Sequence, residues 1–360
     1  MASVGQVARD ITDSRKGTKT GYPQGGARFD WAMVGLSALF LAGLWVDGWA
    51  HFHDKVDDSF FTPWHFIFYG SFGLLALFLG YNQVRNVNRG HAFSKALPRG
   101  YQLSLIGVAV FATSGAIDMV WHMLFGIEGG TEALMSPSHI GLAIGMGFVF
   151  SGTVIATWIQ AKQREDLRGW LNGWRLFGPM ILGMTMLITI AWFFTSYANP
   201  SVTPYIAMGS RSDQIQDFGV TSILFSAAIL SGFALPMLRR WRLPFGTFTV
   251  IFGISTAMLT VLNDFYLLIP GAIIAGLLVD ILVNRLRPSQ GAAWRLLIVA
   301  FCVPFIYYAM YFLTMYLIDT LIWSVHVWTG AMFISGLMGL ALALLTIISA
   351  DEKLKAADNQ

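Results

Sequence analysis

Long apolar runs alternate with short polar stretches along almost the whole chain. Runs of about 20 apolar residues are typical of helices that cross a lipid bilayer. We expect such spans near 30–50, 64–84, 100–122, 138–160, 176–196, 218–238, 246–264, 266–284, 296–317 and 323–349. Only Asn263 and Asp264 separate the seventh span from the eighth. The pattern predicts an all-α fold, a polytopic membrane helix bundle of about ten transmembrane helices.

The composition excludes several other classes of protein. Of the 360 residues, 55% are hydrophobic and only 12% are charged, which is more apolar surface than a soluble core can bury. The single cysteine, Cys302, lies inside an apolar run, so a disulfide scaffold, a CxxC zinc site and a cysteine-ligated cluster are excluded. The chain has no P-loop, Rossmann glycine pattern, Ser-His-Asp order or HExxH motif, and we expect no nucleic-acid partner.

Lysine and arginine concentrate on one side of the predicted bundle. Of the 23 basic residues, all but Lys55 and Arg211 lie in the N-terminal stretch, after an even-numbered span, or in the C-terminal stretch. Because basic loops stay in the cytoplasm, we expect both termini there, an even number of spans, and insertion in an inner (cytoplasmic) membrane. This divides the chain into a cytoplasmic tail (1–28), a four-helix unit (29–160), six further helices (161–349) and a second cytoplasmic tail (350–360).

One polar motif occurs twice, at the outer ends of the first two pairs of predicted spans. In each copy an aspartate and a histidine four residues apart end one helix, where they share a face. A second histidine follows in a Ser/Thr-Pro-x-His sequence, in which the hydroxyl residue caps the next helix and proline takes its first position. The first triad is Asp47, His51 and His65, and the second triad is Asp118, His122 and His139. We interpret them as a duplicated two-helix unit.

Both triads are candidate sets of metal ligands. A lone histidine at a membrane boundary more often extends to the headgroups or caps a helix. Here, instead, four histidines and two aspartates lie at four helix ends on one side of the bundle. A bound ion that neutralises their buried charge explains such a group. Imidazole with carboxylate and without thiolate allows copper, non-haem iron or zinc. The triads would face the periplasm or exterior, where acidic loop residues would attract cations. These residues, which equally fit ordinary solvated loop charges, are Asp54, Asp57, Asp58, Glu128 and Glu132.

The two triads resemble those of a known family, the C subunit of the copper membrane monooxygenases, which act on methane, ammonia or short hydrocarbons. In that family Asp-x3-His ends one helix and Thr-Pro-Ser-His begins the next, as in the first triad with Phe-Thr-Pro-Trp-His ending at His65. Its second set, Asn-x3-His followed by Pro-Leu-His, corresponds to the second triad with Ser-Pro-Ser-His ending at His139, although Asp118 stands where the family has asparagine. The resemblance covers residues 30–160, under half of the chain.

The resemblance implies two neighbouring copper sites near the outer membrane face and O2 chemistry on a small apolar or ammonia-like substrate. It also implies partner subunits in a membrane complex, because the activity of that family depends on them. A non-enzymatic copper or zinc handling or transport protein is an alternative, although we find no further ligands deeper in the spans. A zinc-dependent membrane hydrolase, in which one aspartate is the general base, is another.

Other polar and small residues have simpler interpretations. His53 is a weaker candidate ligand, and His326 is interpreted as a boundary histidine rather than as an extra ligand or a donor to the ligands. Asp280 is expected to pair with Arg285 or Arg287. Tryptophans near the motifs fit an interfacial belt: Trp45, Trp49, Trp64 and Trp121. Several glycines fit close helix packing: Gly43, Gly70, Gly73, Gly141 and Gly145.

Overall fold

The computed structural model describes residues 19–55, 61–126, 128–161, 170–202, 211–290 and 293–358. Most of the predicted N-terminal tail, together with Asp57 and Asp58, lies outside the described residues. Within these ranges the named elements are all helices and none is a strand, which confirms the all-α prediction.

In the described part of the chain, nine helices are long and apolar enough to cross a membrane. They are α2 (Ala27–Phe52), α3 (Pro63–Asn88), α4 (Gln102–Phe125), α6 (Pro137–Ala161), α7 (Trp170–Phe194), α9 (Asp213–Arg240), α11 (Leu268–Leu286), α12 (Ala293–Leu317) and α13 (Val325–Asp358). The shorter elements are α5 (Gly130–Met135), α10 (Thr247–Val261), η1 (Phe93–Lys95), η2 (Ser196–Ala198) and η3 (Pro288–Gln290). The predicted polytopic helical bundle is confirmed.

The short apolar helix α10 still joins the two ends of the bundle. Its 15 residues extend about 22 Å, less than the roughly 30 Å of a bilayer's hydrocarbon core. Before α10, the loop backbone accepts a hydrogen bond from Trp174, which lies in the first turns of α7. Gly178, one turn further along α7, packs against Trp31 near the start of α2. After α10, Asp264 lies 2.9 Å from His53, just beyond the opposite end of α2. Nine long helices and α10 therefore correspond to the ten predicted spans.

Asp280, near the end of α11, caps the start of α10. Its carboxylate accepts hydrogen bonds from the backbone N–H groups of Phe248 and Thr249, both at 2.9 Å, and from the Thr249 hydroxyl at 2.7 Å. The carboxylate is buried at a helix N-terminus, where negative charge is stabilised. The expected pairing with Arg285 or Arg287 is wrong, because the first turn of the neighbouring helix offers three donors to this side chain.

We expect Asp280→Asn to lower the free energy of unfolding by about 1–2 kcal/mol, because an amide nitrogen replaces one of the two acceptor oxygens. Thermal unfolding in detergent measures the difference. Asp217→Asn, which changes an exposed carboxylate on α9, is the control and should alter stability by less than about 0.5 kcal/mol. Equal stability of the two variants would contradict the capping role of Asp280.

Helices α4 and α6, which carry the second triad, pack closely through glycine. A Cβ atom at Gly107 would lie 2.7 Å from the Gly145 carbonyl oxygen, and a Cβ at Gly145 would lie 2.7 Å from the Phe111 amide nitrogen. Such backbone contacts are typical of closely packed membrane helices. Among the glycines expected to serve packing, Gly43, Gly141 and Gly145 do so, whereas a Cβ at Gly70 or Gly73 would meet nothing within 4 Å.

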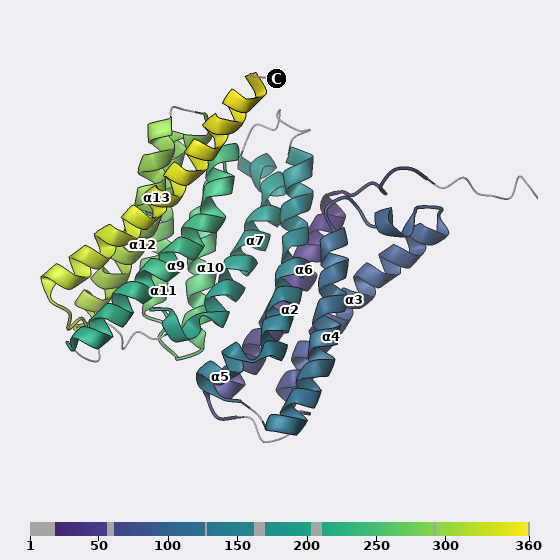
Figure 1. The fold of residues 1–360 in the computed structure, drawn as a ribbon, viewed down its shortest axis with the longest axis horizontal. Coiled ribbons are helices and arrows are strands. Elements are labelled where there is room, and N and C mark those ends of the chain that lie inside the picture. The colour runs from purple at the N-terminus through teal and green to yellow at the C-terminus, as the bar shows by residue number, and fades with distance from the viewer. Residues whose placement is uncertain are drawn as a thin grey trace, which may run out of the picture.

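The bundle has two groups of helices with α7 between them. Figure 1 shows α2, α3, α4 and α6 together on one side and α9 to α13 on the other. Helix α7 packs against α2 and α6 in the first group and against α10 in the second. The short α5 lies at the end of the bundle opposite the marked C-terminus (Figure 1). Both triads lie at this end, because α5 connects α4 to α6 and lines one cavity with both triads.

Two local expectations differ from the structure. Trp45 is not at a lipid interface but is buried, and its indole N–H donates a hydrogen bond to the Met258 carbonyl of α10. The last helix continues to Asp358, so the polar stretch from residue 350 begins as helix. Its alanine, glutamate and lysine residues have high helix propensity, and no proline or glycine interrupts them.

Candidate metal centre

The first triad joins the end of α2 to the start of α3. Asp47 Oδ2 lies 3.5 Å from His65 Nε2 and 4.0 Å from His51 Nε2. The Thr62 hydroxyl caps α3 by accepting the His65 backbone N–H at 3.1 Å, and Pro63 takes the first helical position. Asp47 and His65 are buried, and His51 is partly exposed. The Thr-Pro helix start therefore places His65 opposite the last turns of α2, as the sequence predicts.

The second triad joins the end of α4 to the start of α6 in the same way. Asp118 Oδ1 lies 3.1 Å from His139 Nε2, and Asp118 Oδ2 lies 3.5 Å from His122 Nε2. The Ser136 hydroxyl accepts the His139 backbone N–H at 3.4 Å and contacts the Ser138 hydroxyl at 3.1 Å. Asp118 is only 1% exposed. A carboxylate this deeply buried requires compensating positive charge or hydrogen bonds.

The geometry of the triads fits bound metal ions. In each triad the three residues offer ligand atoms that lie within 4.8 Å of one another. Two ligand atoms about 2.1 Å from one tetrahedral ion are about 3.4 Å apart. Asp47 and His65, and likewise Asp118 and His122, are 3.5 Å apart, which exceeds the roughly 2.7–3.2 Å of a good hydrogen bond. Asp47 Oδ1 is buried without a hydrogen-bond partner among the described residues, and a cation would compensate for this.

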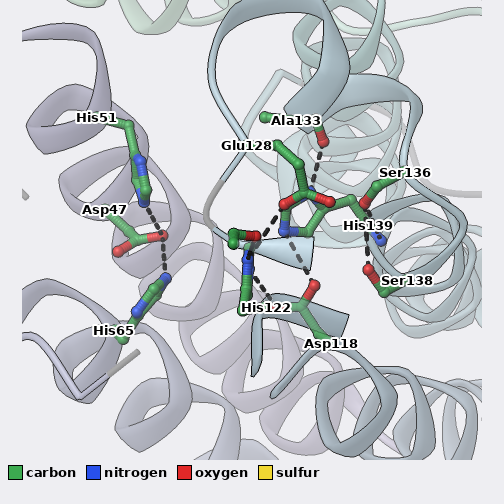
Figure 2. A network of polar contacts seen from close by, with 11 residues as sticks. Asp47, His51, His65, Asp118, His122, Glu128, Ala133, Ser136, Ser138 and His139 are labelled. Carbon is green, nitrogen blue, oxygen red and sulfur yellow. Dashed lines mark hydrogen bonds and ion pairs between the residues drawn. The ribbon is translucent and has the colours of Figure 1, made fainter. Parts of the chain in front are cut away.

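Both triads line one cavity of about 330 Å³. Figure 2 shows the first triad on one side of this region and the second triad on the other. Helices α2, α3, α4, α6 and α7 form most of the walls, and α7 adds two phenylalanines to the cavity. The apolar lining includes Leu44, Phe68, Leu142, Met146, Phe193 and Phe194. The structure therefore brings the six predicted ligand residues together around one small, largely apolar space.

Glu128 contacts the second triad, which its position in the sequence does not indicate. The sequence predicts only an acidic outer loop, yet the Glu128 carboxylate lies 3.2 Å from His122 Nδ1 and lines the cavity. The loop backbone contributes as well, because the Ala133 carbonyl contacts Nδ1 of His139. The one signal in the sequence is the length of the loop between His122 and His139, which exceeds that between the corresponding histidines of the first copy.

The two remaining outer histidines lie outside the cavity lining. His53 pairs with Asp264 at 2.9 Å, and this hydrogen bond, with one to the Trp49 carbonyl, raises the pKa of His53. The Tyr266 hydroxyl, and then His53, lower the pKa of Asp264. His326 is exposed at the start of α13 and does not line the cavity. His53 thus joins α2 to the loop after α10 and has no contact with the triads among the described interactions.

No protein family, curated protein or solved structure matches this chain. The fold and the site therefore define its class directly. It is a polytopic helical membrane protein with two Asp-His-His groups whose ligand atoms lie close enough together for a metal ion.

Proposed function

We propose that this protein binds two metal ions, one in each triad, and that it is a copper-dependent monooxygenase or a subunit of one. Its substrate would be small and either apolar or ammonia-like, and O2 would be the oxidant. The observation that carries the proposal is the presence of two Asp-His-His triads around one apolar cavity of about 330 Å³. Two imidazoles and a carboxylate form a donor set that suits copper, with iron or zinc as the alternatives.

The residues present have distinct roles in this proposal. Asp47, His51 and His65 would hold one ion, and Asp118, His122 and His139 would hold the other. Bound copper would supply the redox chemistry with O2. The cavity lies at the small end of the range of ligand sites, which runs from about 300 to 1,000 Å³, and so favours a substrate of few atoms. Its aliphatic and aromatic walls would limit the access of water and would admit an apolar molecule from the bilayer.

The equivalence of the two helix pairs supports a duplicated metal-binding unit. In both pairs the aspartate and the first histidine end one helix, and a capping hydroxyl, a proline and the second histidine begin the next. The distribution of lysine and arginine supports an orientation in which both triads face the periplasm or exterior of a cytoplasmic membrane. In this orientation partner subunits of a membrane complex would have access to the site from outside.

The site supports an enzyme better than a transporter. A transport path needs ligands at successive depths, and in the described part of the chain the groups of three candidate ligands are the two triads at one end of the bundle. The opposite end of the first four helices has a different polar group, in which Asp30 accepts hydrogen bonds from Tyr101 and Gln160. That group contains no histidine, and it joins α2 and α6 to Tyr101, the residue before α4.

Substrate-dependent oxygen uptake tests the proposed activity. Native membranes that contain the protein and its associated subunits should consume O2 when a small alkane or ammonia is supplied with an electron donor. A copper chelator and His51→Ala/His122→Ala should each abolish the uptake, because both remove the ions. Metal flux into vesicles without oxygen consumption would instead establish transport. Zinc content with insensitivity to copper chelators would establish a hydrolase.

A further inference from the structure

The segment between α4 and α6 contacts both histidine rings of the second triad at Nδ1, the nitrogen that faces away from Asp118. His122 Nδ1 lies 3.2 Å from a Glu128 carboxylate oxygen and 3.2 Å from the Gly126 carbonyl oxygen. The Ala133 carbonyl contacts Nδ1 of His139. Nε2 of both rings meanwhile faces Asp118. Figure 2 shows these contacts on the second triad. The segment therefore fixes which nitrogen of each ring is available to an ion.

The Glu128 carboxylate is unusual among these contacts because it carries a charge. Its side chain is only 11% exposed, and both of its carboxylate oxygens are buried. Neither oxygen has a hydrogen-bond partner among the described residues, and the contact of Oε2 with His122 is an ion-pair contact. A buried carboxylate is costly unless positive charge lies nearby. An imidazole bound to a cation would provide that charge, because the ion makes the ring beside the carboxylate more positive.

The carboxylates of the cavity are unequally divided between the triads. Three of the described residues that line it are acidic, namely Asp47, Asp118 and Glu128. Asp47 serves the first triad, whereas Asp118 and Glu128 both contact histidines of the second. A carboxylate that accepts the outer N–H of a ligand histidine orients the ring and makes it a stronger donor. The two triads are therefore expected to differ in affinity, even though their ligand residues are the same.

We propose that Glu128 is a positioning residue of the second triad, which makes this triad the tighter of the two metal sites. Its carboxylate lies 3.2 Å from His122 Nδ1 and attracts that side of the ring, which helps to direct Nε2 towards the ion and adds negative charge beside the site. This inference rests on the proposal that the triads bind metal ions. It concerns the affinity of one site and not the reaction.

A titration of copper into the second triad alone tests the role of Glu128. His51→Ala is the background, because it removes a ligand of the first triad, and Cu²⁺ is titrated in competition with a chelator of known affinity. Glu128→Gln should weaken binding about 10–100-fold, the usual effect of removing such a partner from a ligand histidine. Glutamine keeps the length of the side chain and a hydrogen-bond acceptor, so the loss reports mainly the charge.

Glu132→Gln is the matched control, because it removes the same charge from an exposed position in the same segment. It should leave the affinity within about twofold of the background. Equal affinities in the Glu128→Gln and Glu132→Gln proteins would overturn the proposal. In a His122→Ala background, where only the first triad remains, Glu128→Gln should leave Cu²⁺ binding unchanged, and a loss there would also overturn it.

Spectroscopy separates positioning from direct ligation. The electron paramagnetic resonance spectrum of Cu²⁺ in the second triad should keep its nitrogen hyperfine pattern and its g values in Glu128→Gln. A spectrum that indicates the loss of an oxygen ligand would overturn the positioning role, since Glu128 would then be a ligand. If the His51→Ala background bound no copper while the wild-type protein bound two ions, the triads would not be independent sites. If the wild-type protein bound none, the proposed function itself would fail.

Discussion

His51→Ala and His122→Ala are each expected to lower the metal content from two ions per chain to one, and the double variant should retain none. Each substitution removes one imidazole from a triad whose three residues supply the ligand atoms. The remaining aspartate and histidine form a weak site, because affinity depends strongly on the number of protein ligands. Elemental analysis of protein that has been extracted in detergent and dialysed against a weak chelator measures the loss.

Two other histidines provide matched controls for this experiment. His53→Ala and His326→Ala each remove a histidine from the end of the bundle that carries the triads. Neither residue lines the cavity. Both variants should retain two ions per chain. Equal metal content in the wild-type protein and the double variant would show that the triads are not the metal sites.

Gly145→Val is expected to have the largest effect on stability, with the loss of one ion per chain. A Cβ at this position would lie 2.7 Å from the Phe111 amide nitrogen and 2.9 Å from its Cα, so α6 must move away from α4. Overpacking of this kind costs about 1–3 kcal/mol even when side chains can adjust, and here the obstacle is backbone. The shift separates His139 on α6 from Asp118 and His122 on α4, so the second triad should lose its ion.

Gly147→Val is the control, because a Cβ there would meet nothing within 4 Å. It adds the same side chain to the same helix and should preserve both the unfolding temperature in detergent and the two bound ions. The first triad, on α2 and α3, should keep its ion in both variants. A Gly145→Val protein that is as stable and as metal-rich as Gly147→Val would contradict the proposed link between helix packing and the second triad.

The sequence predicts the parts of this structure that depend on local chemistry. Apolar run length is sufficient to locate the helices, since lipid requires every backbone polar group to be paired within the helix. The spacing of Asp47 and His51 along one helix, and the Thr-Pro start before His65, place three side chains together without knowledge of the rest of the fold. The second triad follows from the same two local rules.

Such local rules do not predict contacts between segments that are distant in the sequence. Asp280 has arginines a few residues away, yet it caps a helix that begins 33 residues earlier, a choice that only the packing of α10 on α11 determines. The position of Trp45 near the end of a span predicts an interfacial side chain, but α10 packs against it. Glu128 is an ordinary loop carboxylate in the sequence, and its contact with His122 depends on how the loop folds back over the cavity.

Anomalous diffraction from metal-loaded crystals tests the central claim most directly. Data collected on both sides of the copper absorption edge should give two peaks per chain. One should lie among Asp47, His51 and His65, and the other among Asp118, His122 and His139. Two such peaks, each within about 2.0–2.2 Å of histidine nitrogen and aspartate oxygen atoms, are the result that we predict. A map from copper-loaded protein with no peak at either triad would contradict the account.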